Sequence, residues 1–157
     1  MSEKIFTLQA EIEANIKAIE DAYGVLHKAT MPELDEQSTI LVGYYLHVLY
    51  GLFENVFVRI ASAFGNHIED ASQWHSQLLW RMTLDIKGLR PAVISQELYA
   101  HLNELRRFRH LFRNAYLLHF DPVRLNLVLQ NAQQAEQLYK QEIEQFQTFL
   151  NTLIDDV

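Results

Sequence analysis

The spacing of apolar residues along the chain predicts four long helices and one short one. From Glu3 to about Lys28, apolar residues recur every three or four positions, which is the repeat of an amphipathic helix. A second helix is expected over residues 39–64, with Ser38 as its N-cap. This second helix is apolar on nearly all sides, so we expect it to be the central helix of a bundle.

The second half of the chain predicts three further helices. A short one is expected over residues 73–82, followed by a connector that contains Gly and Pro. The next helix is expected to begin after Ser95, its N-cap, and to run to about Leu118. Asp121 and Pro122 have the residue types of an N-cap and a first helical position, so the last helix is expected to begin there.

Composition agrees with this helical pattern. Five Gly and three Pro in 157 residues favour long helices over many short strands. We therefore expect a single domain over residues 1–157, all-α, folded as an antiparallel four-helix bundle with one extra short helix. The apolar run over residues 40–63 is interrupted by polar and charged residues, which favours a core helix over a membrane span.

Charge and cysteine content restrict the function further. The chain has no Cys, which excludes disulfides and thiolate metal sites and is typical of a reducing cytoplasm, and no signal peptide is visible. We therefore expect a cytoplasmic protein. A net charge of −7 argues against indiscriminate nucleic-acid binding, and no DNA binding is expected. Contact with RNA would have to come from a local basic patch.

One such patch lies within residues 105–121. Four of the eight arginines fall between positions 106 and 113. Helical spacing places Arg109, Arg113 and Tyr116 in one stripe. The apolar residues beside this stripe are Leu102, Leu105 and Phe112. Such a mixture indicates a partly buried site or an interface, because guanidinium groups are buried only with partners. The alternative is a surface helix whose arginines cover apolar neighbours.

Glu54 is a candidate partner for these arginines. It lies on the expected central helix, seven residues after His47, and a buried carboxylate there needs a cation. We therefore predict that Glu54 pairs with Arg109 or Arg113. The alternative is that Glu54 points to solvent at an edge of the bundle.

The residue types present favour acid–base chemistry on a phosphodiester. No Glu-x-x-His pairs, His-x-x-x-His spacing or Gly-rich phosphate loop occurs, so we expect neither a metal site nor another cofactor. Cleavage of a phosphodiester requires a group that moves a proton, which histidine does near neutral pH, and a cation at the phosphate. Arg109, Arg113, His110 and His119 hold these parts within one helix and its end.

Five short motifs stand out along the chain: Leu46-His47-Val48-Leu49-Tyr50, Glu54, Trp74-His75, Arg90-Pro91-Ala92-Val93 and the segment from Leu105 to Tyr116. Together these motifs resemble the HepT-like branch of the HEPN superfamily. The resemblance covers the chain from about position 38. It implies a four-helix-bundle homodimer and a metal-independent ribonuclease toxin, whose Arg–His motif forms a composite site at the dimer cleft. It also implies a minimal nucleotidyltransferase (MNT) antitoxin that can adenylylate a tyrosine two residues after the motif histidine.

This chain departs from that Arg–His motif. If Arg109 is the motif arginine, Asn114 occupies the histidine position and Tyr116 that of the modified tyrosine. If Arg113 is the motif arginine, His119 follows after five residues, but an aspartate replaces the tyrosine. Asparagine can hold a phosphate oxygen but cannot transfer a proton.

Proton transfer would then fall to His119 or His110. We favour His119, because a helix end allows its side chain to turn toward the cleft, whereas His110 lies about 100° around the helix from Arg109. We further expect a two-fold homodimer in which the two motif helices face each other, because one small bundle could not fully bury the stripe of arginine and apolar residues.

Three functions fit the sequence. The first is a ribonuclease toxin that acts on RNA, with tRNA as a candidate, and is silenced by an MNT-type nucleotidyltransferase. The second is a catalytically lapsed HEPN binding subunit that presents Tyr116 or RNA to that nucleotidyltransferase. The third is an unrelated helical interaction protein.

Overall fold

The computed structural model describes residues 2–29, 34–65, 73–113 and 121–155. These residues form five helices: α1 (Ser2–Leu26), α2 (Glu36–Ala63), α3 (Trp74–Arg81), α4 (Gln96–Arg113) and α5 (Pro122–Asp155). The predicted all-α, HEPN-like bundle with one extra short helix is confirmed.

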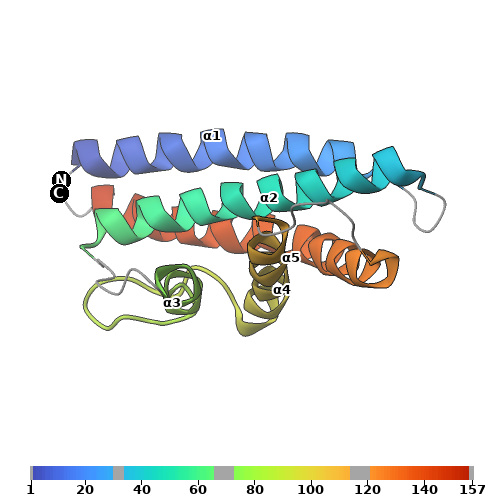
Figure 1. The fold of residues 1–157 in the computed structure, drawn as a ribbon. Helices are drawn as coiled ribbons and strands as arrows, with labels where there is room; N and C mark the ends of the chain where they lie inside the picture. Colours follow the sequence, from blue (N-terminus) through green and yellow to red (C-terminus); the bar gives the residue numbers. More distant parts are fainter. Residues whose placement is uncertain (1, 30–33, 66–72, 114–120, 156–157) are drawn as a thin grey trace.

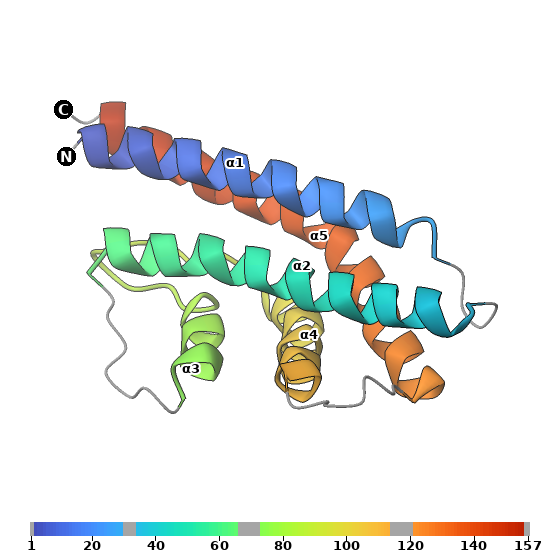
Figure 2. The ribbon, with the colours of Figure 1, turned by 45° about the horizontal axis from the view of Figure 1, so that its top comes forward.

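The helices are arranged around α2. The long helices α1, α2 and α5 are roughly aligned, and α1 runs opposite to both of the others (Figure 1). In both views α3 and α4 lie on the side of α2 that faces away from α1 (Figures 1 and 2). The first and last described residues lie together at one end of the bundle (Figure 1). Because α2 contacts all four other helices, it is the central helix, as predicted.

A single core of apolar side chains fills the space between the helices. Fully buried members are Ile12 and Ile19 of α1, Phe53, Val56, Phe57 and Ile60 of α2, Leu102 and Leu105 of α4, and Ile143 and Leu150 of α5. By length and composition α2 could cross a membrane, but half of its most apolar stretch is buried inside the bundle. That burial is typical of a core helix.

The start of α2 differs from the prediction. The helix begins at Glu36, and its N-cap is Asp35, not Ser38. The Asp35 carboxylate accepts a hydrogen bond from the backbone N–H of Ser38 at 2.7 Å, which satisfies one of the free donors of the first turn. The same contact lowers the pKa of Asp35 below its usual value. Gly65 follows the end of α2 with a φ of 73°, a conformation that glycine adopts without strain.

The connector from α3 to α4 is held together by Arg90, which is buried. Its guanidinium donates hydrogen bonds to the backbone carbonyls of Leu84 (3.2 Å), Pro91 (3.1 Å) and Arg81 (3.2 Å). The Arg81 carbonyl at the end of α3 accepts this bond in addition to one from the backbone N–H of Leu84 at 3.1 Å. Arg90 therefore has a structural role in fixing α3 against the start of α4.

The starts of α4 and α5 agree with the sequence prediction. The Ser95 hydroxyl accepts a hydrogen bond from the backbone of Leu98, and Ser95 also donates to the Glu142 carboxylate of α5. Asp121 accepts a hydrogen bond from the backbone of Val123, as expected of an N-cap before Pro122. The expected end of α4 near Leu118 lies outside the described residues.

Candidate functional site

The centre of the site is the carboxylate of Glu54 on α2, a residue that is only 5% exposed as a whole. One of its oxygens, Oε1, accepts a hydrogen bond from Nη1 of Arg109 on α4 at 2.6 Å. The other, Oε2, lies 2.7 Å from Nδ1 of His75 on α3. The predicted ion pair between Glu54 and Arg109 is therefore confirmed, and the alternative of a solvent-facing Glu54 does not hold.

The three helices bring these side chains together through their apolar faces. Leu105 and Phe108 are buried and fix the register of α4, so the next residue, Arg109, reaches α2. Leu78 and Leu79 are buried and fix α3 against the bundle, with His75 in its first turn. Core packing thus determines which polar groups meet at Glu54.

Tyr50, one turn before Glu54 on α2, lies beneath the guanidinium of Arg109. The Arg109 Cζ lies 5.9 Å from the centroid of the Tyr50 ring, within the range of a cation–π contact. Burial, and then the charge of Glu54, raise the pKa of Tyr50 well above its usual value, so its ring stays neutral. Its hydroxyl is buried and has no hydrogen-bond partner among the described residues. Tyr50 therefore supports Arg109 from within the core.

The two partners of Glu54 reach the surface. The side chain of Arg109 is 22% exposed and that of His75 is 36% exposed, against 7% for Glu54. The His75 ring also stacks on Trp74, with ring centroids 3.8 Å apart and an angle of 30° between the planes. A buried carboxylate thus holds a cation and an imidazole in fixed positions near solvent, where a phosphate could approach them.

The other arginines of α4 have different surroundings. Arg106 donates from Nε to the side chain of Asn103 at 2.9 Å, and Arg107 makes an exposed pair with Glu104. The backbone of Arg113 belongs to α4, four residues beyond Arg109.

The remaining predicted site residues fall, in whole or in part, outside the described structure. Of Arg113 and His110, the backbone is described and the side chain is not. Asn114, Tyr116 and His119 lie entirely outside the described residues. Their roles stay predictions.

The apolar residues beside the arginine stripe are covered within the chain where the structure describes them. Leu102 and Leu105 are fully buried within this single chain, so they do not face a second copy. The reason is that α4 packs between α2 and α5, and these helices cover the apolar side of the stripe. Arg109 is the part of the stripe that remains accessible among the side chains described.

His75 is a site residue that was not among the predicted candidates. No ligand or catalytic spacing along the chain points to it, since it precedes Arg109 by 34 residues and lies on a different helix. The sequence signal was the Trp74-His75 pair within the resemblance. A second signal was the chemistry of a buried carboxylate, which needs a partner for each oxygen.

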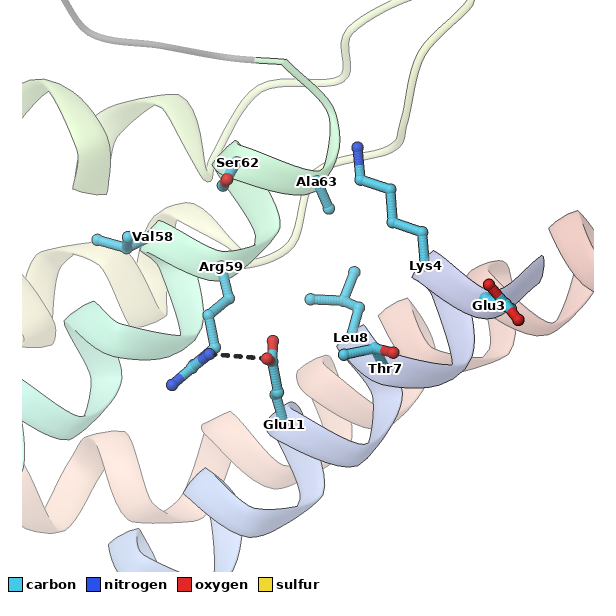
Figure 3. A pocket seen from close by; sticks show the side chains of 9 residues that line it. All are labelled: Glu3, Lys4, Thr7, Leu8, Glu11, Val58, Arg59, Ser62 and Ala63. Atoms are coloured by element: carbon cyan, nitrogen blue, oxygen red, sulfur yellow. Dashed lines mark ion pairs between the residues drawn. The ribbon is translucent and has the colours of Figure 1, made fainter. Parts of the chain in front are cut away.

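A separate groove lies between the N-terminal part of α1 and the C-terminal part of α2 (Figure 3). Its volume is about 500 Å³, and its walls include an ion pair of 3.0 Å between Arg59 and Glu11. Those side chains are 42% and 37% exposed, and Glu54, His75 and Arg109 do not line the groove. Within the described residues, no group of three or more His, Asp or Glu side chains could hold a metal ion.

One protein-family model matches more than half of the chain, including the helices that carry the site. The family model described as "HepT-like protein" matches residues 41–150, a range that includes Glu54, His75 and Arg109. No curated protein and no solved structure gave a match. The matched range covers more than half of the chain and runs from α2 into the last turns of α5. The chain therefore belongs to the HepT-like family of the HEPN superfamily.

Proposed function

We propose that this protein is a metal-independent ribonuclease toxin of a HEPN/MNT-type toxin–antitoxin module, with tRNA as a candidate substrate. HepT-like proteins are generally associated with such modules. The observation that carries the proposal is the orientation of Arg109 by a buried carboxylate, beside an imidazole that is also accessible.

Arg109 supplies the cation that phosphodiester cleavage requires. Only one of its nitrogens, Nη1, is used by Glu54, and the side chain keeps contact with solvent. Its Nε is buried and has no hydrogen-bond partner among the described residues, so the hydrogens left for a phosphate are those of the two Nη nitrogens. These can donate to two phosphate oxygens, where negative charge develops during the reaction. Glu54 holds the geometry before the substrate binds, so little reorganisation is needed.

The other candidate residues, in the segment that follows Arg109, have proposed roles as well. Arg113 is proposed as a second phosphate ligand and Asn114 as a donor to a phosphate oxygen, with His119 or His110 as groups that transfer a proton. Tyr116 is proposed as the residue that an MNT-type antitoxin adenylylates. The proposed location is the cytoplasm, where both RNA and such a partner occur.

A two-fold homodimer is part of this function. A second copy would double the number of arginines at the cleft and concentrate positive charge despite the net charge of −7. We expect sedimentation velocity at micromolar concentration to give the mass of two 18.4 kDa chains. A single species with the mass of one chain would contradict the composite site.

The second candidate function is a catalytically lapsed binding subunit that partners the nucleotidyltransferase. The observation that favours it is Asn114 at the position of the motif histidine when Arg109 is the motif arginine. Such a subunit would bind RNA or present Tyr116 without cutting RNA.

Expression without the partner distinguishes the two functions. The toxin is expected to arrest growth when expressed alone and to fragment total RNA in buffer that contains a chelator of divalent metals. Coexpression of the neighbouring nucleotidyltransferase should restore growth. Normal growth and intact RNA with the unmodified chain would reject the ribonuclease and favour the binding subunit.

A further inference from the structure

We propose that His75 on α3 is the group that takes the proton from the attacking 2′-hydroxyl of the RNA, next to a phosphate bound by Arg109. This inference rests on the proposed ribonuclease function. It assigns the proton transfer to a helix other than the one that carries the arginine cluster, and so replaces His119 and His110 as the candidates for that role.

Arg109 and His75 share one carboxylate. Glu54 binds Arg109 through Oε1 at 2.6 Å and His75 through Oε2 at 2.7 Å. Because both oxygens belong to one buried group, the imidazole and the guanidinium are each within hydrogen-bond distance of the same side chain. A substrate phosphate on Arg109 would therefore have the His75 ring as its neighbour.

Nε2 of His75 is the ring nitrogen that Glu54 does not use. The ionised Glu54 carboxylate can only accept hydrogen bonds, so the imidazole hydrogen lies on Nδ1 and the lone pair on Nε2. Among the described residues Nε2 has no hydrogen-bond partner, and the side chain is 36% exposed. This nitrogen is therefore the one that can meet a substrate.

The His75 ring is also held rigidly. The ring is held at one edge by Glu54 and on one face by Trp74, and α3 is anchored by buried leucines. A carboxylate that fixes the tautomer and the direction of an imidazole is the arrangement that positions a general base. A second histidine–carboxylate contact, between His27 and Glu136, is more open to solvent, with an imidazole that is 59% exposed.

The proposed step balances without a further reactant. Nε2 of His75 takes the proton of the 2′-hydroxyl as the O2′–P bond forms and the P–O5′ bond breaks. The departing 5′ oxygen takes a proton from water, and the resulting hydroxide is neutralised by the proton on the imidazolium. The products are a 2′,3′-cyclic phosphate and a 5′-hydroxyl.

The experiment uses substitutions that separate proton transfer from support of Glu54. His75→Asn keeps a donor at the position of Nδ1 and removes Nε2. We expect RNA cleavage by His75→Asn to fall by ~10²–10⁴-fold, the usual contribution of a general base, with a thermal midpoint close to that of the wild type. Imidazole added to the buffer should restore part of the cleavage in His75→Ala. The control variant His27→Ala, which loses a histidine–carboxylate contact elsewhere, should cleave at the wild-type rate.

Several results would overturn the assignment. Wild-type cleavage by His75→Asn would mean that His75 only supports Glu54. Loss of cleavage in His119→Ala or His110→Ala, with His75→Asn active, would return proton transfer to the motif helix. His75→Asn could also lose cleavage because it is less stable than the wild type. In that case the rescue experiment decides, and no recovery of cleavage when imidazole is added to His75→Ala would count against the assignment. A wild type that does not cut RNA rejects the ribonuclease function itself, whereas the other results leave that function standing.

Discussion

Replacing Arg109 by alanine is expected to reduce RNA cleavage by at least ~10²–10³-fold, the usual effect of removing one preorganised donor from a charged transition state. No other described side chain is fixed by Glu54 and also able to donate to two phosphate oxygens. The measurement is the initial rate of cleavage of a defined RNA at saturating enzyme, so that weakened binding does not hide the chemical step.

Two further variants make this result interpretable. Arg109→Lys keeps the charge next to Glu54 and therefore the fold, but it lacks the bidentate geometry, so its cleavage rate should remain low. Arg107→Ala removes an arginine two residues away whose pair with Glu104 is exposed, and its rate should match that of the wild type. Equal losses in Arg107→Ala and Arg109→Ala would mean that the cluster acts only through its overall charge.

Replacing Glu54 by alanine is expected to have the largest effect on stability. It leaves Arg109 and His75 without the group that both of them bind, inside a core that includes Tyr50. Loss of one partner from a buried pair costs ~3–5 kcal/mol, and we expect about 3 kcal/mol because Arg109 keeps some contact with water. For a chain of this size that corresponds to a fall in the thermal midpoint of roughly 6–12 °C.

The control for this measurement is a second acid on the same bundle. Glu11→Ala removes the pair with Arg59, in which both side chains are exposed, and should change stability by less than ~1 kcal/mol. Glu54→Gln keeps the volume and one acceptor oxygen, so it should be more stable than Glu54→Ala and yet lose most cleavage. An unchanged thermal midpoint in Glu54→Ala would mean that Glu54 is not part of the core.

Local residue chemistry was sufficient for most helix boundaries. Ser95, Asp121 and Pro122 were identified from residue type alone, and the structure uses them as predicted. The start of α2 was misplaced because Asp35 and Ser38 are both good N-caps, and a preference scale cannot choose between them. The structure uses the aspartate, whose carboxylate bonds to the backbone of Ser38.

Half of the site was predictable for an electrostatic reason. A carboxylate on a helix that is apolar on nearly all sides must find a cation, and the chain has one cluster of arginines to supply it. This requirement predicted the ion pair of Glu54 with Arg109 or Arg113. It could not choose between the two arginines, because they lie one helical turn apart on the same helix face.

The sequence by itself determined the helical class, the central position of α2 and the need of Glu54 for a partner, because apolar periodicity and charge burial are local properties. Only the tertiary structure decided that Leu102 and Leu105 belong to the core. Their spacing beside the arginine stripe would be the same if they lay at an interface. The tertiary structure also decided that His75 reaches Glu54. That contact depends on how α3 packs against α2 and α4, and packing between helices leaves no periodic signal along the chain.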